Sequence, residues 1–306
     1  MRNFFTATTG AILLSLLPVS TTIAAQLKGE TIQMGHGKLW SWLEVDDSGN
    51  LSALGLSFTS SALHGLQTKD DPGGIPHADG HDPSFEYELD LPEEASTTAF
   101  KHIVLNWNPS GHHPDFLFGV PHFDFHFYTI TPEERYQIST QNPAMFDYPD
   151  QMYWPVGYQP AVPPPELAEL GVTGSETDRM GLHWYDPNSS PYNGELPFTE
   201  TFFYGSYDSE FIFWEPMVDK SYLETQPNVT KTIKLPSAYS KSGYYPTQYS
   251  INYDPNNSIY SVALKGLTYR EATRVPEPAP TLGLFTLTAF ITGSIFKRNQ
   301  NKRRLS

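Results

Sequence analysis

The chain has 306 residues, no cysteine and a formal net charge of −15. Without cysteine there are no disulfides, no thiolate metal sites and no thiol nucleophiles. The acidic balance argues against nucleic acid as a partner and favours cations, although solubility alone explains most of such a charge. Aromatic residues make up 14% of the chain beside 22 glycines and 27 prolines, which favours short strands joined by turns.

The N-terminus follows the pattern of a secretory signal peptide. Arg2 supplies a positive charge, residues 11–17 form an apolar run, and small residues end at Ala24 and Ala25. The apolar run is shorter than the ~20 residues that a membrane span needs. We therefore expect signal peptidase to cleave after Ala24 or Ala25, the alternative being a buried N-terminal helix.

The C-terminus has the opposite order of parts. Pro276, Glu277 and Pro278 precede an uncharged run over 279–296, and five basic residues follow within 297–304. A run of this length can span a ~30 Å hydrocarbon core, and the basic cluster should stay in the cytoplasm.

This tail resembles the PEP-CTERM sorting signal, which consists of the same three parts in the same order. The resemblance implies recognition by an exosortase, removal of the tail after transient anchoring in the inner membrane, and delivery to the cell surface or exopolysaccharide matrix. An ordinary single-pass anchor is the alternative. The predicted organisation is a signal peptide (1–25), an extracytoplasmic domain (26–274) and a sorting tail (275–306) with a transmembrane segment (279–296).

The extracytoplasmic part should form one mainly β (α+β) domain, an antiparallel sandwich or barrel-like fold with a few short helices. It carries 13 basic and 33 acidic residues, a net charge of −20. The expected elements are a hairpin of 39–45 and 51–58, a short helix from Thr59 to 66, strands at 85–89 (an edge) and 99–107, a helix from Thr131 to about 139, a helical turn at 163–171, a hairpin of 198–204 and 210–215 around 205–208, and a last strand at 262–269.

Residues 122–128 alternate between polar and phenylalanine side chains without a fault. Successive side chains of a strand point to opposite faces, so the phenylalanines should face the core and the polar residues should share the other face. The polar face holds His122, Asp124, His126 and Tyr128, and the apolar face holds Phe123, Phe125 and Phe127.

Imidazole and carboxylate groups that point into one space are typical ligands of a divalent ion. Zinc takes such ligands at ~2.0–2.2 Å, usually four of them. Next-but-one residues lie ~6.5–7 Å apart, so Asp124 and His126 can converge on one ion more easily than His122 and His126. The predicted ligands are His122, Asp124, His126 and His183, and Glu215, Tyr128 and His112 are predicted to be further ligands or supporting residues. Zinc is the expected ion, and no organic cofactor is expected.

Two other interpretations of this strand stay open. Asp124 and Tyr128 can complete a buried hydrogen-bond network with the histidines, or the polar face can be exposed to solvent. The loop 76–81 repeats the Pro-His-x-Asp-x-His spelling, which we interpret as a chance match in a loop rich in these residues. Elsewhere, His36, His64 and His102 are expected to be ordinary hydrogen-bonding residues.

Five runs carry a family resemblance: 106–112, 121–128, 181–184, 198–208 and 215–217. They resemble an uncharacterised family of bacterial exported proteins typified by one from Thermus thermophilus. The resemblance covers roughly residues 35–225 and implies no settled activity. A looser analogy links the histidine strand to the zinc strand of α-type carbonic anhydrases, although His122 and His126 are four residues apart.

Three functions fit the sequence. The first is a non-enzymatic surface or matrix protein with a metal or polar site. The second is a metal-dependent hydrolase or lyase with Glu215 or Glu133 as proton acceptor, and the third is a carbohydrate-binding module with Tyr153, Trp154 and Tyr158 stacking on exopolysaccharide. No nucleophile elbow, phosphate loop or His-Glu-x-x-His motif occurs, which favours the first. The expected partners are signal peptidase, exosortase and exopolysaccharide, and no nucleic acid is expected. The sequence does not decide whether the protein forms an oligomer.

Overall fold

The computed structural model describes residues 25–76, 81–162 and 176–274. The described chain up to Thr273 is one compact unit of antiparallel strands with a few short helices, which confirms the predicted fold class. No helix of these described segments is long and apolar enough to cross a membrane. The predicted transmembrane segment, most of the signal peptide and the helical turn at 163–171 lie outside the described residues.

The first sheet has six strands, in the order β1-β2-β3-β15-β14-β12. The predicted hairpin is its β2–β3 pair, and the Asp46 side chain closes the turn by accepting from the backbone of Ser48 and Asn50. Its strands are β1 (Ala25–Met34), β2 (Gly37–Val45), β3 (Leu51–Thr59), β12 (Asn228–Thr232), β14 (Gln248–Asp254) and β15 (Ile259–Lys265).

The second sheet has eight strands, in the order β4-β5-β6-β11-β10-β9-β7, with β8 paired to β9. Its first strand, β4, lies at an edge as predicted. The strands are β4 (Phe85–Asp90), β5 (His102–Asn108), β6 (His122–Tyr128), β7 (Gln159–Pro160), β8 (Glu176–Thr177), β9 (Gly181–Tyr185), β10 (Glu200–Tyr207) and β11 (Glu210–Asp219), and β13 (Gly243–Tyr245) pairs separately with β16 (Thr268–Arg270).

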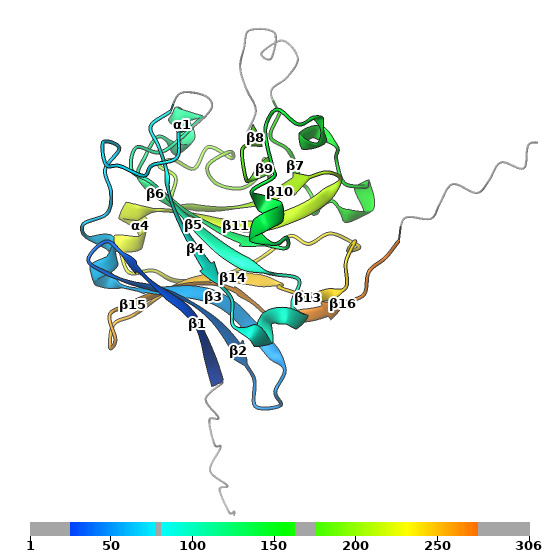
Figure 1. Cartoon of the computed structure of the whole chain (residues 1–306), viewed down its shortest axis with the longest axis horizontal. Coiled ribbons are helices and arrows are strands. Elements are labelled where there is room, and N and C mark those ends of the chain that lie inside the picture. Colours follow the sequence, from blue (N-terminus) through cyan, green and yellow to red (C-terminus); the bar gives the residue numbers. More distant parts are fainter. Residues whose placement is uncertain (1–24, 77–80, 163–175, 275–306) are drawn as a thin grey trace, which may run out of the picture. The chain divides into compact units, whose positions relative to one another are not determined.

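The two sheets pack face to face as a sandwich, and Figure 1 shows them as two layers. Phe123, Phe125 and Phe127 are fully buried between them, and Phe123 lies 6.5 Å from Phe58 of the first sheet, ring centre to ring centre. The phenylalanine face of β6 therefore belongs to the core, as the alternation predicted. Its polar face points away from this core, and His122 on that face packs against Phe118 of α1 (Asp115–Phe118).

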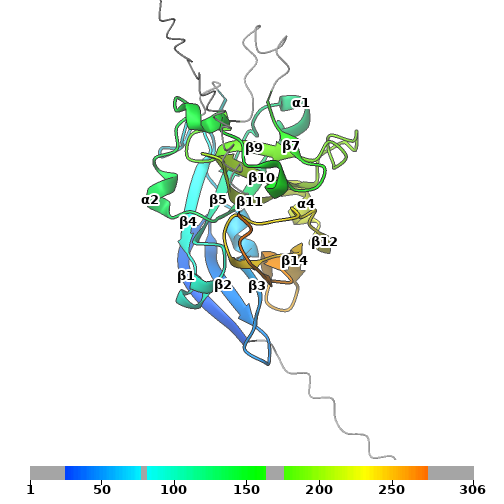
Figure 2. The ribbon, with the colours of Figure 1, turned by 90° about the vertical axis from the view of Figure 1, so that its right-hand side faces the viewer.

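The helices are shorter than the sequence predicted. Thr131 forms the predicted capping box with Glu134, but α2 (Pro132–Arg135) ends at Arg135 because the amides of Gln137 and Ile138 bond three residues back instead of four. Figure 2 shows α2 beside β4, and the other helix is α4 (Lys220–Glu224).

Two further predictions need correction. Thr59 precedes a single 3-10 turn (Ser60–Leu63) and makes no capping bond, since its hydroxyl instead accepts from the Lys38 amide. The second predicted hairpin exists as β10 and β11, but its turn is Asp208-Ser209, both with positive φ (49° and 63°), and the strands run through the segment expected to turn.

Candidate metal centre

The polar face of β6 is completed by its two neighbouring strands. In the β5–β6 register Asn106 lies opposite Asp124, and Asn108 lies opposite His122. On the other side, the β6–β11 register runs from Trp214 opposite Phe127 to Met217 opposite Asp124, which puts Glu215 across from His126. All of these polar side chains are buried, so the interpretation of an exposed strand face is wrong.

One cluster consists of His112, His122 and Asp124, whose ligand atoms lie within 4.8 Å of one another. The distance from His122 Nε2 to Asp124 Oδ1 is 3.3 Å, and from His112 Nε2 to Asp124 Oδ2 it is 3.9 Å. Asn108 donates to Asp124 Oδ2 at 2.7 Å and fixes the carboxylate, whereas the buried Oδ1 has no hydrogen-bond partner in the part of the chain that the structure describes.

Backbone carbonyls fix the protonation of both imidazoles in this cluster. His122 Nδ1 lies 2.7 Å from the Val120 oxygen, and His112 Nδ1 lies 2.8 Å from the His113 oxygen. A carbonyl oxygen only accepts, so each Nδ1 carries the hydrogen and each neutral ring keeps a lone pair on Nε2. The Nε2 lone pairs therefore face the Asp124 carboxylate, which is the arrangement that outer carbonyls impose on metal-binding histidines.

The second cluster consists of His126, His183 and Glu215, again within 4.8 Å. His126 Nε2 lies 3.6 Å from Glu215 Oε1, and His183 Nε2 lies 3.6 Å from Glu215 Oε2. These contacts are longer than hydrogen bonds. Among the described residues, neither ring nitrogen of His126 has a hydrogen-bond partner. The same is true of Glu215 Oε2.

The four predicted ligands thus fall into two groups. His122 and Asp124 lie with His112, and His126 and His183 lie with Glu215. The sequence grouped Asp124 with His126 because they are neighbours on one face of β6, but each side chain finds its partners on other segments of the chain.

Burial dominates the electrostatics of both clusters. It raises the pKa of Asp124 to about 7, against the opposing hydrogen bond from Asn108. Burial, and then the negative charge of Asp124, raise the pKa of Glu215 well above its ordinary value. Burial, and then the positive charge of His183, lower the pKa of His126 well below its ordinary value. An unpaired charge is costly to bury in either cluster. A cation bound by the carboxylate and the neutral imidazoles of a cluster would therefore be stabilised.

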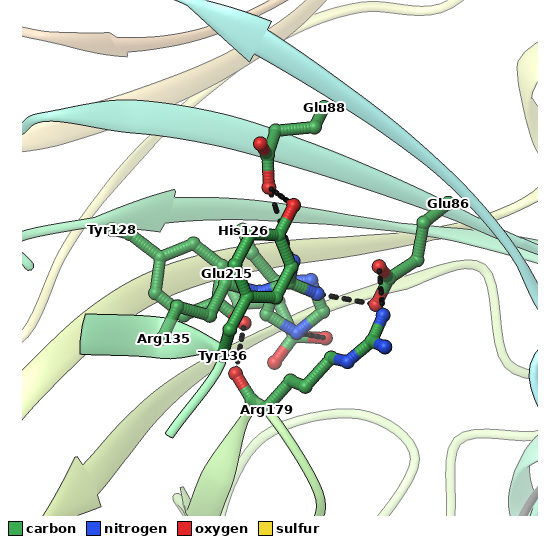
Figure 3. Close-up of polar contacts among 8 residues, drawn as sticks. All are labelled: Glu86, Glu88, His126, Tyr128, Arg135, Tyr136, Arg179 and Glu215. Atoms are coloured by element: carbon green, nitrogen blue, oxygen red, sulfur yellow. Dashed lines mark hydrogen bonds and ion pairs between the residues drawn. The ribbon is translucent and has the colours of Figure 1, made fainter. Parts of the chain in front are cut away.

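Arg135 of α2 covers the polar face beside the second cluster, as Figure 3 shows. It pairs with Glu86 and Glu88 of β4, and its guanidinium lies 5.2 Å from the centre of the Tyr128 ring. Tyr128 donates to the Arg179 carbonyl at 3.3 Å and so closes the hydrogen bonds around the site rather than joining a ligand cluster.

A third group, His81, His113 and Asp115, lies at the surface. Asp115 Oδ1 lies 2.9 Å from His81 Nε2 and 2.7 Å from His113 Nδ1. These are hydrogen-bond lengths, so ordinary hydrogen bonds account for the group without an ion.

The sequence missed Asn106 and Asn108 and treated His102 as an ordinary residue. Part of the signal was present, since His102, Asn106 and Asn108 share one face of the strand, but only the pairing of β5 with β6 relates that face to the histidine strand. His102 does make an ordinary bond, with its Nδ1 3.0 Å from the Ile130 oxygen.

The three aromatic residues expected to stack on sugar do not form an exposed platform. Tyr158 is buried and donates to the Phe202 carbonyl. Trp154 is partly buried, donates to the Pro149 carbonyl and packs edge-on against the buried Trp184.

Residues 46–107 match the family described as TTHB210-like, hypothetical protein TTHB210. The match covers β3 and β4 and ends within β5, so it supports part of the predicted resemblance and stops before the histidine strand. A search of the curated proteins and a search of the solved structures gave no significant match.

Proposed function

We propose that the protein is an exported surface or matrix protein that binds a divalent metal ion at His112, His122 and Asp124. The observation that carries the proposal is the pair of Nδ1–carbonyl contacts, which turn both Nε2 lone pairs toward one carboxylate. Three acceptor atoms that face one another in a buried space require a proton or a cation between them.

The distances support an ion. Ligands at ~2.0–2.2 Å around a tetrahedral ion lie about 3.3–3.6 Å apart. The contacts of 3.3 Å and 3.9 Å between the histidine nitrogens and Asp124 are close to this range. Two imidazoles and one carboxylate suit zinc and other first-row divalent ions, and the fourth position would be taken by water.

Binding without catalysis is the function that the surroundings favour. Glu133, one proposed proton acceptor, is exposed on α2, and Glu215, the other, belongs to the second cluster. Two surface hollows of the described chain, one around Gln67 and Trp107 and one around Asn50 and Tyr244, are lined by no member of either cluster. The side chain of His112 is 24% exposed, which gives an ion a route to the first cluster.

Removal of the metal should destabilise the protein. An ion present at 100 to 1,000 times its Kd contributes about 3–4 kcal/mol, which lowers the melting temperature by roughly 5–15 °C when it is removed. We expect this shift when a chelator is added to the metal-loaded wild type at pH 7.5. The shift should shrink in Asp124→Asn and persist in Glu200→Gln, which alters a buried carboxylate that Lys231 and Tyr249 hold instead. An unchanged wild-type melting curve, with no bound metal, would leave the hydrogen-bond network as the explanation.

Acid should also release the ion, because only neutral imidazole is a ligand. Metal binding should weaken below pH ~6.5, the ordinary pKa of histidine, or somewhat lower where the metal competes with protons. Equilibrium dialysis against zinc between pH 5 and 8 measures this. Binding that stays constant across the range would exclude histidine ligands.

Export is supported by the two ends of the sequence: the Arg2 signal-peptide pattern and the Pro276-Glu277-Pro278 tail with its basic end. Intact mass of the protein from its native host should correspond to a chain without either end. A mass that includes residues 297–306 would indicate a retained anchor instead of sorting.

A further inference from the structure

The geometry points to a second metal ion, bound by His126, His183 and Glu215, beside the first. This site has its own ligands and would make the buried face of the eight-stranded sheet a two-ion centre.

The ligand atoms have the arrangement expected around an ion. The Glu215 carboxylate lies between two imidazoles, with Oε1 3.6 Å from His126 Nε2 and Oε2 3.6 Å from His183 Nε2. Both contacts are too long for hydrogen bonds and equal the upper end of the distance between neighbouring ligands of a tetrahedral ion, about 3.6 Å.

Hydrogen bonding within the protein leaves this site unexplained. His126 is fully buried, yet neither of its nitrogens has a hydrogen-bond partner among the described residues, and the same holds for Glu215 Oε2. Buried polar atoms without partners are rare in folded proteins because each costs about 1–3 kcal/mol. A bound cation would satisfy His126 Nε2 and Glu215 Oε2 together.

Aromatic rings line one part of the site, whereas Arg135 lies beside it on the other. The His126 ring centre lies 4.8 Å from that of Phe213 and 5.6 Å from that of Tyr128. His183 lies 5.1 Å from Phe213 and 6.1 Å from Phe203, measured in the same way. An apolar wall around a histidine–carboxylate group strengthens its attraction for a cation, because little solvent screens the charges.

The two sites are neighbours on one strand. Asp124 and His126 are next-but-one residues of β6, which places their backbones ~6.5–7 Å apart. Asp124 and Glu215 are both buried on the paired strands β6 and β11, so two negative charges there would repel in the absence of cations. One divalent ion at each carboxylate would remove this repulsion.

Asn106 provides independent support for a polar occupant beside Asp124. It lies opposite Asp124, is fully buried, and neither its amide nitrogen nor its oxygen has a partner among the described residues. Metal-bound water would satisfy both atoms, and Asn106 would then act as a positioning residue. Asn106→Leu should therefore weaken zinc binding; in a site without ions, removing an unpartnered amide should instead stabilise the fold.

Zinc titration of the metal-free, untagged protein tests the inference by calorimetry and by metal analysis. We expect two ions per chain in the wild type and in Glu200→Gln, and one in each of Asp124→Asn and Glu215→Gln. His183 is the most accessible ligand of the second site, so His183→Gln should disturb folding least. This variant should weaken one of the two binding events at least tenfold. Circular dichroism of each variant establishes that it is folded.

A single ion in the wild type would overturn the inference. If that ion is lost in Asp124→Asn and kept in Glu215→Gln, the proposed function stands with one site. If it is lost in both variants, the two clusters share one ion. If the wild type binds none, the proposed function fails as well.

Discussion

Arg135 shows how one side chain supports the buried face. It is fully buried, and its partners Glu86 and Glu88 come from β4, more than forty residues earlier in the chain. It also lies against Tyr128, so it links the edge strand to the histidine strand. The Glu86 side chain is only 13% exposed, so loss of the guanidinium would deprive a mostly buried carboxylate of its main partner.

Arg135→Met should therefore lower the free energy of unfolding by about 3 kcal/mol, since breaking a buried ion pair by removing one partner costs about that much. Arg179→Met is the matched control, because Arg179 is 41% exposed and contacts Glu86 at 3.4 Å. It should cost less than ~1 kcal/mol. Urea unfolding compares the two, and equal effects would contradict the role assigned to Arg135.

His102 should make stability depend on pH. Burial, and then the positive charge of Arg135, lower its pKa from 6.5 to about 4. The unfolded chain takes up a proton below pH ~6.5 while the folded protein does not, so stability is full above that pH and is lost as pH falls toward 4. The loss from this group is on the order of 3 kcal/mol.

The His102→Gln variant isolates this contribution. With a chelator present, so that metal release plays no part, urea unfolding between pH 7 and 4 should show a shallower loss in the variant than in the wild type. Identical slopes would show that His102 is protonated equally in the folded and unfolded states.

The hairpin of β10 and β11 carries Glu215 into the second cluster. Its turn residues Asp208 and Ser209 both have positive φ, a conformation that favours glycine or asparagine. The Ser209 amide bonds the Asp147 carbonyl, which a glycine would preserve.

Ser209→Gly should therefore stabilise the protein by roughly 1 kcal/mol, because it removes the steric cost of a left-handed residue. Ser209→Ala keeps that cost and should bring no gain. Thermal melts of both variants check this, and a gain in the alanine variant would show that the backbone conformation is not the cause.

The sequence predicted those elements whose signal is local. The alternation of β6, the capping box of Thr131 and the β2–β3 turn depend on neighbouring residues, and the structure confirms them. The end of α2 was predicted too late because Ile138 turns into the core, and tertiary packing decides that. Strand β1 was missed since its largely exposed, mixed sequence lacks an apolar face.

The molecule as a whole determines the site. His112, His183 and Glu215 come from three different segments, and their partners on β6 follow from strand order and from the loop before α1. The sequence identified all three as candidates, but it could not assign them to two clusters because it does not specify which strands are neighbours. Asn106 and Asn108 needed the same information.

Anomalous X-ray scattering from crystals of the zinc-loaded protein, recorded on both sides of the zinc absorption edge, tests metal binding most directly. We predict one peak about 2.0–2.2 Å from His112 Nε2, His122 Nε2 and Asp124, and a second peak among His126, His183 and Glu215. Both peaks should vanish below the edge. Density that shows only water, with the histidines hydrogen-bonded to the carboxylates and no anomalous signal, would contradict metal binding on this face.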